Sequence, residues 1–197
     1  MRGERQARQT GRTLIELLLA VGILLSALAL GLPGLRAYSS EAQILGAAEV
    51  FKQEFRKARS IATTTNRQTA IRFEDTSAGS FVSVYQDGNN NGVLSADIQR
   101  GVDKRVSGPR RLTTGAATVR IAILPGTPAP PPDSGLLDTR DPIRFGRSEM
   151  ASFTPLGGAT PGTFYLAGDG VQAAIRVTGE TSRIRLLIYR TGKWRER

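Results

Sequence analysis

The chain has 197 residues and a formal net charge of +10, with no cysteine and no histidine. These absences exclude thiol catalysis and cysteine-based zinc sites, and they remove the usual general base and metal ligand, so we expect no enzyme activity and no cofactor. The length accommodates a membrane anchor and one globular domain, and the basic charge favours nucleic acid or acidic surfaces as partners.

A long apolar segment follows the basic N-terminal residues. Leu14 to Leu32 spans 19 residues, and a helix of that length, at about 1.5 Å per residue, matches a bilayer core of about 30 Å. Arginines precede the segment and positive flanks stay cytoplasmic, so the rest of the chain is expected on the periplasmic side of a bacterial inner membrane. We predict one membrane-spanning helix over residues 12–35, with a bend or stop at Pro33-Gly34.

Glu16 is the only charged residue in this apolar segment. An acid costs about 2.5–3.5 kcal/mol near the bilayer centre and less near an end, so its presence predicts a function. Two other interpretations are a plain anchor and a secretory signal peptide cut at Ala27-Leu28-Ala29, which leaves Leu30 as the mature N-terminus. Glu16 disfavours the signal peptide, because export signals keep charge out of their apolar core.

Residues 11–18 read Gly-Arg-Thr-Leu-Ile-Glu-Leu-Leu, which resembles the type IV prepilin signature Gly-Phe-Thr-Leu-Ile-Glu-Leu-Leu. In that family a prepilin peptidase cuts after the glycine. The resemblance implies a leader over residues 1–11, cleavage between Gly11 and Arg12, and N-methylation at Arg12, where phenylalanine is usual. Glu16 is then the fifth mature residue and Pro33 the twenty-second, where pilin helices commonly carry proline.

The same resemblance implies roles for Glu16 and Pro33 in filament assembly. Where such helices pack as a bundle, the Glu16 carboxylate can pair with the N-terminal amine at Arg12 of a neighbouring subunit. A paired charge is tolerable in a low dielectric and an unpaired one is not. Glu16 is therefore expected to set the stagger between subunits.

A second helical pattern covers residues 36–66. Apolar residues recur at intervals of three and four, which places them on one helical face: Ile44, Ala48, Phe51, Phe55, Ala58 and Ala62. We expect this amphipathic helix to pack on a sheet.

Short β-type runs follow up to residue 189. They are Thr69–Phe73, Phe81–Gln86, Val119–Leu124, Ile143–Phe145, Thr163–Leu166, Ala173–Val177 and Arg183–Tyr189. The predicted fold class is α+β and pilin-like: a long membrane-spanning helix continues into the amphipathic helix, which packs on a mainly antiparallel β-domain of one or two sheets over residues 67–189. Residues 125–135 are proline-rich and predict a semi-rigid or disordered surface loop, and residues 190–197 predict a basic tail.

Three C-terminal runs are similar to one family. They are Phe153-Thr154-Pro155-Leu156-Gly157-Gly158, Gly162-Thr163-Phe164, and Arg183–Tyr189 followed by Gly192-Lys193. They resemble the block that closes the β-domain in the GspH/FimT family of minor pseudopilins. The resemblance implies a structural subunit of a type II secretion pseudopilus or a type IV pilus. Its partners are then other pilins, the prepilin peptidase and the inner membrane.

The run from Asp87 to Gly92 resembles the first half of a calcium loop. Oxygen ligands at alternate positions followed by glycine suit a hard cation, and the candidate ligands are Asp87, Asn89, Asn91 and Asp97. The last ligand position holds Ile98 where glutamate is usual, so a polar loop between strands is the favoured interpretation. Glu74-Asp75 is interpreted as a solvated turn rather than an acid–base pair.

The C-terminal residues are strongly basic. From Arg183 to Arg197, Glu196 is the only acid. Gly192-Lys193-Trp194-Arg195 resembles the Gly-Arg-x-Arg ending that FimT-type minor pilins use to bind DNA during uptake. The resemblance implies a site for double-stranded DNA made of Arg190, Lys193, Trp194, Arg195 and Arg197.

Alternatives remain for this basic segment. Trp194 either stacks on an exposed base or covers the sheet, and Arg110-Arg111 is a candidate second patch. A tail that only solvates the last strand is the other interpretation. For the whole chain, a structural minor pseudopilin is favoured, a DNA-binding minor pilin is second, and an exported enzyme is disfavoured because catalytic residue types are scarce.

Overall fold

The computed structural model describes residues 14–76, 79–111 and 119–197, without the side chains of residues 31–37, 40, 75–76 and 79–80. The chain divides into two compact units, Met1–Ser39 and Ser40–Arg197, and each is described by itself. The predicted leader, Gly11 and Arg12 lie outside the described residues.

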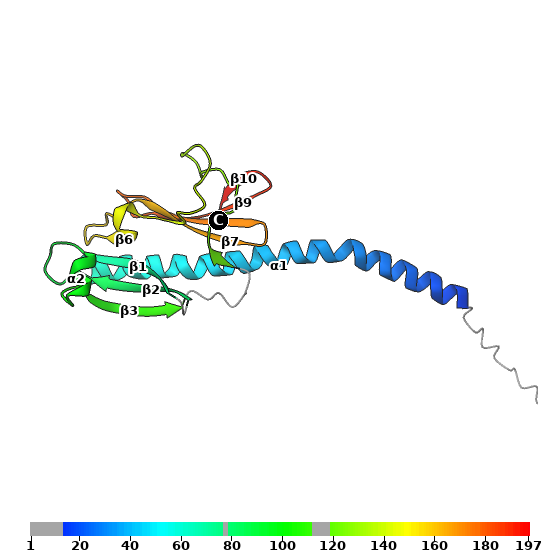
Figure 1. Ribbon diagram of the computed structural model, residues 1–197, viewed down its shortest axis with the longest axis horizontal. Helices are drawn as coiled ribbons and strands as arrows, with labels where there is room; N and C mark the ends of the chain where they lie inside the picture. The colour runs from blue at the N-terminus through cyan, green and yellow to red at the C-terminus, as the bar shows by residue number, and fades with distance from the viewer. Residues whose placement is uncertain (1–13, 77–78, 112–118) are drawn as a thin grey trace, which may run out of the picture. The chain divides into compact units, whose positions relative to one another are not determined.

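Helix α1 runs without interruption from Leu14 to Thr65 (Figure 1). Its backbone stays helical through Pro33 and Gly34, so the helix does not stop at the position where the sequence predicted a bend or stop. In the N-terminal unit every side chain from Leu14 to Leu30 is exposed. We predicted a membrane-spanning helix over residues 12–35. Within the described part of the chain, no helix is long and apolar enough to cross a bilayer.

In the C-terminal unit α1 is amphipathic, as predicted. All six residues of the predicted stripe are buried in the main hydrophobic core: Ile44, Ala48, Phe51, Phe55, Ala58 and Ala62. The small alanines let the strands approach the helix closely, while Phe51 and Phe55 fill the space between the sheets.

The first sheet has four strands in the order β3-β2-β1-β6, all antiparallel. They are β1 (Thr69–Thr76), β2 (Gly79–Gln86), β3 (Lys104–Arg111) and β6 (Met150–Phe153). The sequence predicted neither β3 nor β6. β3 carries Gly108-Pro109 and a register shift against Val82 and Val84, and β6 is only four residues long, so neither shows a clear alternating pattern.

The second sheet follows the order β10-β9-β8-β7-β4, with β5 also paired to β7. Its strands are β4 (Arg120–Ile121), β5 (Ile143–Arg144), β7 (Gly162–Gly168), β8 (Val171–Val177), β9 (Ile184–Arg190) and β10 (Lys193–Glu196). Two short helices, α2 (Ser95–Gln99) and η1 (Gly146–Ser148), complete the described elements. All strand pairings in both sheets are antiparallel, which confirms the α+β prediction.

One core joins the two sheets to the helix. Figure 1 shows the second half of α1 between the sheets, and the main core contains Val82 from the first sheet and Ile175 from the second. Phe55 lies at its centre, with its ring centroid 5.7 Å from that of Phe145 and 6.4 Å from that of Phe164. This core fixes the geometry of the surface features of the C-terminal unit that are described below.

Two segments predicted from local pattern are set by tertiary contacts instead. The strand predicted over 119–124 shrinks to β4, because the buried Gln172 side chain accepts a hydrogen bond from the Leu124 N–H at 2.7 Å and donates to the Ala122 carbonyl at 3.0 Å. The proline-rich loop is tied to the sheet: Arg176 donates to the carbonyl of Pro131 at 2.7 Å and pairs with Asp133.

Candidate functional site

The predicted basic tail is an edge strand. β9 and β10 form a hairpin around Thr191-Gly192, whose φ angles are 50° and 80°. Positive φ at both central residues is the type I′ geometry that matches the twist of paired strands, and Gly192 adopts it without steric cost. The predicted basic tail over residues 190–197 therefore contains the last strand of the second sheet, β10.

Alternation along β10 divides its side chains between two faces. In the register of the two strands, Lys193 lies opposite Arg190, and Arg195 lies opposite Ile188. The Ile188 side chain belongs to the main core. Lys193, Arg195 and Arg190 therefore share the face toward α1, and Arg197 follows at the same spacing. The structure thus brings together four of the five residues predicted to bind DNA.

Glu41 of α1 is the acid on this basic face. Its Oε2 accepts a hydrogen bond from Arg190 Nη1, and its Oε1 accepts one from Arg197 Nη2 at 3.3 Å. The Glu41 side chain is 16% exposed, against 46% for Arg190 and 56% for Arg197. With Arg195 these residues line a cavity of about 270 Å³. Glu41 is not predictable as a site residue from the sequence, because nothing local marks this acid among others on the helix.

Trp194 lies on the opposite face. Its Nε1 donates to the Pro128 carbonyl at 3.0 Å, and its ring centroid is 5.3 Å from that of Tyr189. The half-buried indole packs against a small apolar cluster that includes Leu187 and Tyr165. Of the two interpretations of Trp194, the structure supports the one in which it covers the sheet.

Glu196 neutralises two further cations of the hairpin. It accepts hydrogen bonds from Arg185 Nη2 at 2.6 Å and Arg183 Nη2 at 3.1 Å. The hydrogen bond from Arg185, together with the positive charges of both arginines, holds the pKa of the Glu196 carboxyl below its ordinary value. Lys193 and Arg195 are left as the two hairpin cations without an ion-pair partner among the described residues.

The candidate second basic patch lies on the other sheet. Arg110 on β3 pairs with Glu54 of α1, which is only 8% exposed, so Arg110 has a structural role. Neighbouring Arg111 is exposed. Lys57 of α1 donates to Ser107 Oγ at 2.8 Å and adds a second link between the helix and β3.

The Asp87 loop is organised around buried carboxylates. Asp87 accepts hydrogen bonds from the backbone N–H groups of Asn89 at 3.0 Å, Asn90 at 2.8 Å and Gly92 at 2.7 Å. The exposure of Asp87 is only 3%. Such bonds stabilise a tight polar turn and use the lone pairs that a cation would need.

Asp97 completes this network from α2. Its Oδ2 accepts from the side-chain amides of Asn91 at 2.9 Å and Asn89 at 3.3 Å, and its Oδ1 pairs with Arg100. The hydrogen bond from Asn91 is the main reason that the pKa of the Asp97 carboxyl is lowered. The structure therefore brings the four candidate calcium ligands together as a hydrogen-bonded loop, and the described residues contain no group of three or more metal-ligating acids.

The paired acids Glu74-Asp75 belong to β1, so their interpretation as a turn is wrong. Glu74 pairs with Arg72 across a distance of 3.3 Å between Arg72 Nε and Glu74 Oε1. The Glu74 carboxylate is thus neutralised by an arginine on its own strand.

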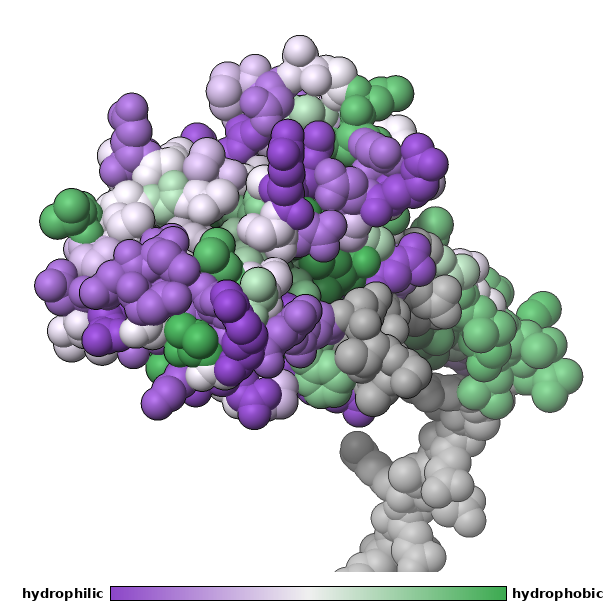
Figure 2. All heavy atoms as spheres, turned by 60° about the vertical axis from the view of Figure 1, so that its left-hand side comes forward, coloured by the Kyte–Doolittle hydropathy of each residue, from purple (hydrophilic) through white to green (hydrophobic). Residues whose placement is uncertain are grey.

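A groove of about 630 Å³ lies between the proline-rich loop and the second sheet. Its three arginines, Arg144, Arg176 and Arg185, pair with Asp141, Asp133 and Glu196 respectively. These ion pairs hold the loop and the hairpin in place. Figure 2 shows a mainly hydrophilic face of the C-terminal unit with only scattered hydrophobic residues.

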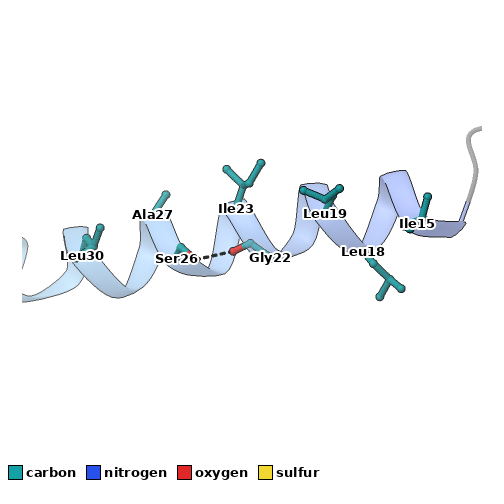
Figure 3. Close-up of a pocket in the computed structure, with 8 residues that line it drawn as sticks. All are labelled: Ile15, Leu18, Leu19, Gly22, Ile23, Ser26, Ala27 and Leu30. Atoms are coloured by element: carbon teal, nitrogen blue, oxygen red, sulfur yellow. Dashed lines mark hydrogen bonds between the residues drawn. The ribbon is translucent and has the colours of Figure 1, made fainter.

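In the N-terminal unit Glu16 lies in the first turn of α1, where the helix dipole stabilises a negative charge. It is exposed and makes no hydrogen bond or ion pair within the described residues. The apolar face shown in Figure 3 has small residues at its centre, where Ser26 Oγ donates to the Gly22 carbonyl at 2.8 Å. The predicted site residues Gly11 and Arg12 lie outside the description, as does the side chain of Pro33.

Comparison with known proteins gives one match. A family model described as type II transport protein GspH matches residues 47–182, more than half of the chain. A search of curated proteins and a search of solved structures each found no match. The matched residues include the buried half of α1 and both sheets up to β8, but neither the exposed apolar segment nor the β9–β10 hairpin.

Proposed function

The chain belongs to the GspH family of type II transport proteins, and we propose that it is a minor pseudopilin cut after Gly11 by a prepilin peptidase. It then assembles through its N-terminal helix into a type II secretion pseudopilus or a type IV pilus. Its role is structural, and its partners are other pilins and the inner membrane.

The exposed apolar segment of α1 carries this proposal. From Leu14 to Leu30 the helix presents large apolar side chains with no cover, among them Leu14 at 78% exposure and Leu30 at 84%. An apolar surface of this length is stable only in lipid or against other apolar helices. Before assembly it anchors the protein in the inner membrane, and in the filament it packs against the helices of other subunits.

Small residues on this segment support helix packing. Gly22 and Ser26 are four residues apart, and such small residues allow close approach of two helices in lipid. The hydrogen bond from Ser26 Oγ to the Gly22 carbonyl satisfies the hydroxyl within its own helix, so burying it against a neighbour leaves no unpaired donor.

Glu16 is the residue whose charge pairing stabilises the assembled filament. Its carboxylate has no partner in the described part of its own chain. Within a bundle the amine at Arg12 of a neighbouring subunit supplies the missing positive charge. An unpaired acid in a low dielectric is unfavourable, so the correctly staggered filament is the state in which Glu16 is best accommodated.

The experiment replaces Glu16 by glutamine in the full-length protein. Membrane insertion and cleavage are expected to stay intact, with Arg12 as the mature N-terminus by mass spectrometry, while recovery with partner pilins from sheared filaments falls at least fivefold. Glu49→Gln on the same helix is the matched control, because the ion pair of Glu49 in the described structure is with Lys52. Recovery of Glu16→Gln with partner pilins at the natural level contradicts the proposal. A mature N-terminus at Leu30 also contradicts it, because that result indicates a secreted protein with a cleaved signal peptide.

A second candidate function is DNA binding during uptake. It is favoured by one observation: Lys193 and Arg195 lie on one face of an edge strand without ion-pair partners in the described structure. Cations that contact phosphates release counterions, so affinity for a DNA duplex is expected to fall steeply with salt and to show little sequence preference. A duplex titration at several salt concentrations tests this, and the absence of binding at about 0.1 M salt rejects it.

A further inference from the structure

The basic face of the β9–β10 hairpin contains an anion site that is already occupied. Arg190 and Arg197 bind the two oxygens of one carboxylate, that of Glu41, from opposite ends of β10. Arg195 lines the same cavity of about 270 Å³ and has no ion-pair partner among the described residues. We propose that Glu41 is an internal competitor that occupies this site in place of a DNA phosphate; the proposal rests on the DNA-binding candidate function.

The chemistry of Glu41 matches that of a phosphodiester. Both carry one negative charge on two terminal oxygens, and both only accept hydrogen bonds. Arginine pairs with either group through the same fork of N–H donors. The arrangement that holds Glu41 therefore holds a backbone phosphate equally well, and the two ligands exclude each other at Arg190 and Arg197.

The internal contact is weak enough to be displaced. Arg190 is 46% exposed and Arg197 is 56% exposed, against 16% for Glu41, so water screens both pairs from the arginine side. Exposed ion pairs contribute little to stability, and a polyanion supplies several phosphates at once. Displacement begins at Lys193 and Arg195, which are free to contact phosphate, and proceeds to the two arginines that Glu41 holds.

This arrangement lowers the apparent affinity for DNA. When only a fraction of the molecules have an open site, the apparent affinity is the intrinsic affinity multiplied by that fraction. Two arginines already neutralised by Glu41 also release fewer counterions when DNA arrives. Glu41 thus sets both the strength of binding and its dependence on salt, so that contact with a single phosphate remains weak and contact with a continuous strand is favoured.

The test uses the full-length protein in a non-ionic detergent and a short DNA duplex of random sequence. Glu41→Gln preserves the shape of the side chain and removes its charge. We expect its affinity to rise by about three- to tenfold at ~0.1 M salt, since each exposed pair accounts for up to about fivefold. The log–log salt slope is expected to steepen by about 1–2, at ~0.9 per phosphate contact.

The control is Glu49→Gln, which makes the same change in net charge on the same helix at a pair with Lys52. Equal effects of Glu41→Gln and Glu49→Gln overturn the proposal, because they reduce it to net charge. A second variant, Arg197→Ala, is measured in both backgrounds. It is expected to weaken binding more when residue 41 is glutamine than when it is glutamate, and equal losses also overturn the proposal.

Two double variants distinguish loss of the Glu41 effect from loss of DNA binding itself. The DNA affinity of the double variant Lys193→Ala/Arg195→Ala is compared with that of Lys104→Ala/Arg105→Ala on β3. The second variant removes the same charges from exposed positions on the other sheet. A loss confined to the hairpin pair supports the DNA site whatever Glu41 does. Equal losses in the two pairs reject a hairpin site, and binding of phosphatidylglycerol vesicles in place of the duplex overturns the nucleic-acid assignment.

Discussion

Replacing Trp194 separates its two proposed roles, covering the sheet and stacking on a base. Trp194→Phe keeps an aromatic ring beside Tyr189 and removes the hydrogen bond that Nε1 donates to the Pro128 carbonyl at 3.0 Å. A neutral hydrogen bond contributes about 0.5–1.5 kcal/mol. The free energy of unfolding is therefore expected to fall by about 1 kcal/mol, with little effect on DNA affinity.

Trp194→Ala removes the ring as well. The aromatic pair with Tyr189 adds about 0.5–1.5 kcal/mol, and the half-buried indole also covers Leu187 and Tyr165. The expected total loss is about 2–4 kcal/mol, below the ~3–5 kcal/mol of a fully buried large aromatic side chain. The proline-rich loop is expected to loosen at the same time, because Pro128 loses its contact with the sheet.

The assay is urea unfolding followed by far-ultraviolet circular dichroism, because Trp194 is the only tryptophan and its variants lose the native fluorescence signal. DNA affinity is measured on the same samples below the unfolding transition. An unfolding free energy that is unchanged in Trp194→Ala, together with a clear loss of DNA affinity in Trp194→Phe, refutes the reasoning. That result places the indole on a nucleotide base and not on the sheet.

Two further predictions concern the core and the Asp87 loop. Phe55→Ala is expected to lower the free energy of unfolding by about 3–5 kcal/mol, since Phe55 is fully buried among four phenylalanine rings. The control Val50→Ala, at a side chain that is 46% exposed, is expected to change it by less than ~0.5 kcal/mol. Similar urea-unfolding midpoints for the two variants refute this prediction. The lowered pKa of the Asp97 carboxyl stabilises the fold above the unfolded value of about 4, and this contribution is lost as pH falls through the folded pKa. Asp97→Asn is therefore expected to be less stable than the natural protein at pH ~7 and to approach it below pH ~4; a difference that is constant with pH contradicts the assignment.

Elements with a strong local period were predictable from the sequence. The stripe from Ile44 to Ala62 was correctly assigned because each member lies on one face of a regular helix, whatever that face packs against. The alternating runs that became β2, β7, β8 and β9 were found for the same reason. The absence of histidine and cysteine is likewise a property of the sequence, whatever the fold.

Elements held by neighbours were not predictable. β10 reads as a charged tail because its residues Lys193 to Glu196 become a strand only through pairing with β9. The one local signal was Thr191-Gly192, a two-residue turn between β9 and the basic end. β3 was missed because Gly108-Pro109 breaks its alternation, and β4 is short because Gln172 from another strand completes its hydrogen bonds.

The sequence by itself thus determined the helix, its buried stripe, most of the strands and the presence of many basic residues near the C-terminus. The tertiary structure alone decided which of those charges are available. Glu41 and Arg190 are separated by 149 positions, yet their side chains form one ion pair. Whether a cation is free or neutralised depends on groups brought together by folding, because Coulomb interactions act through space and not along the chain.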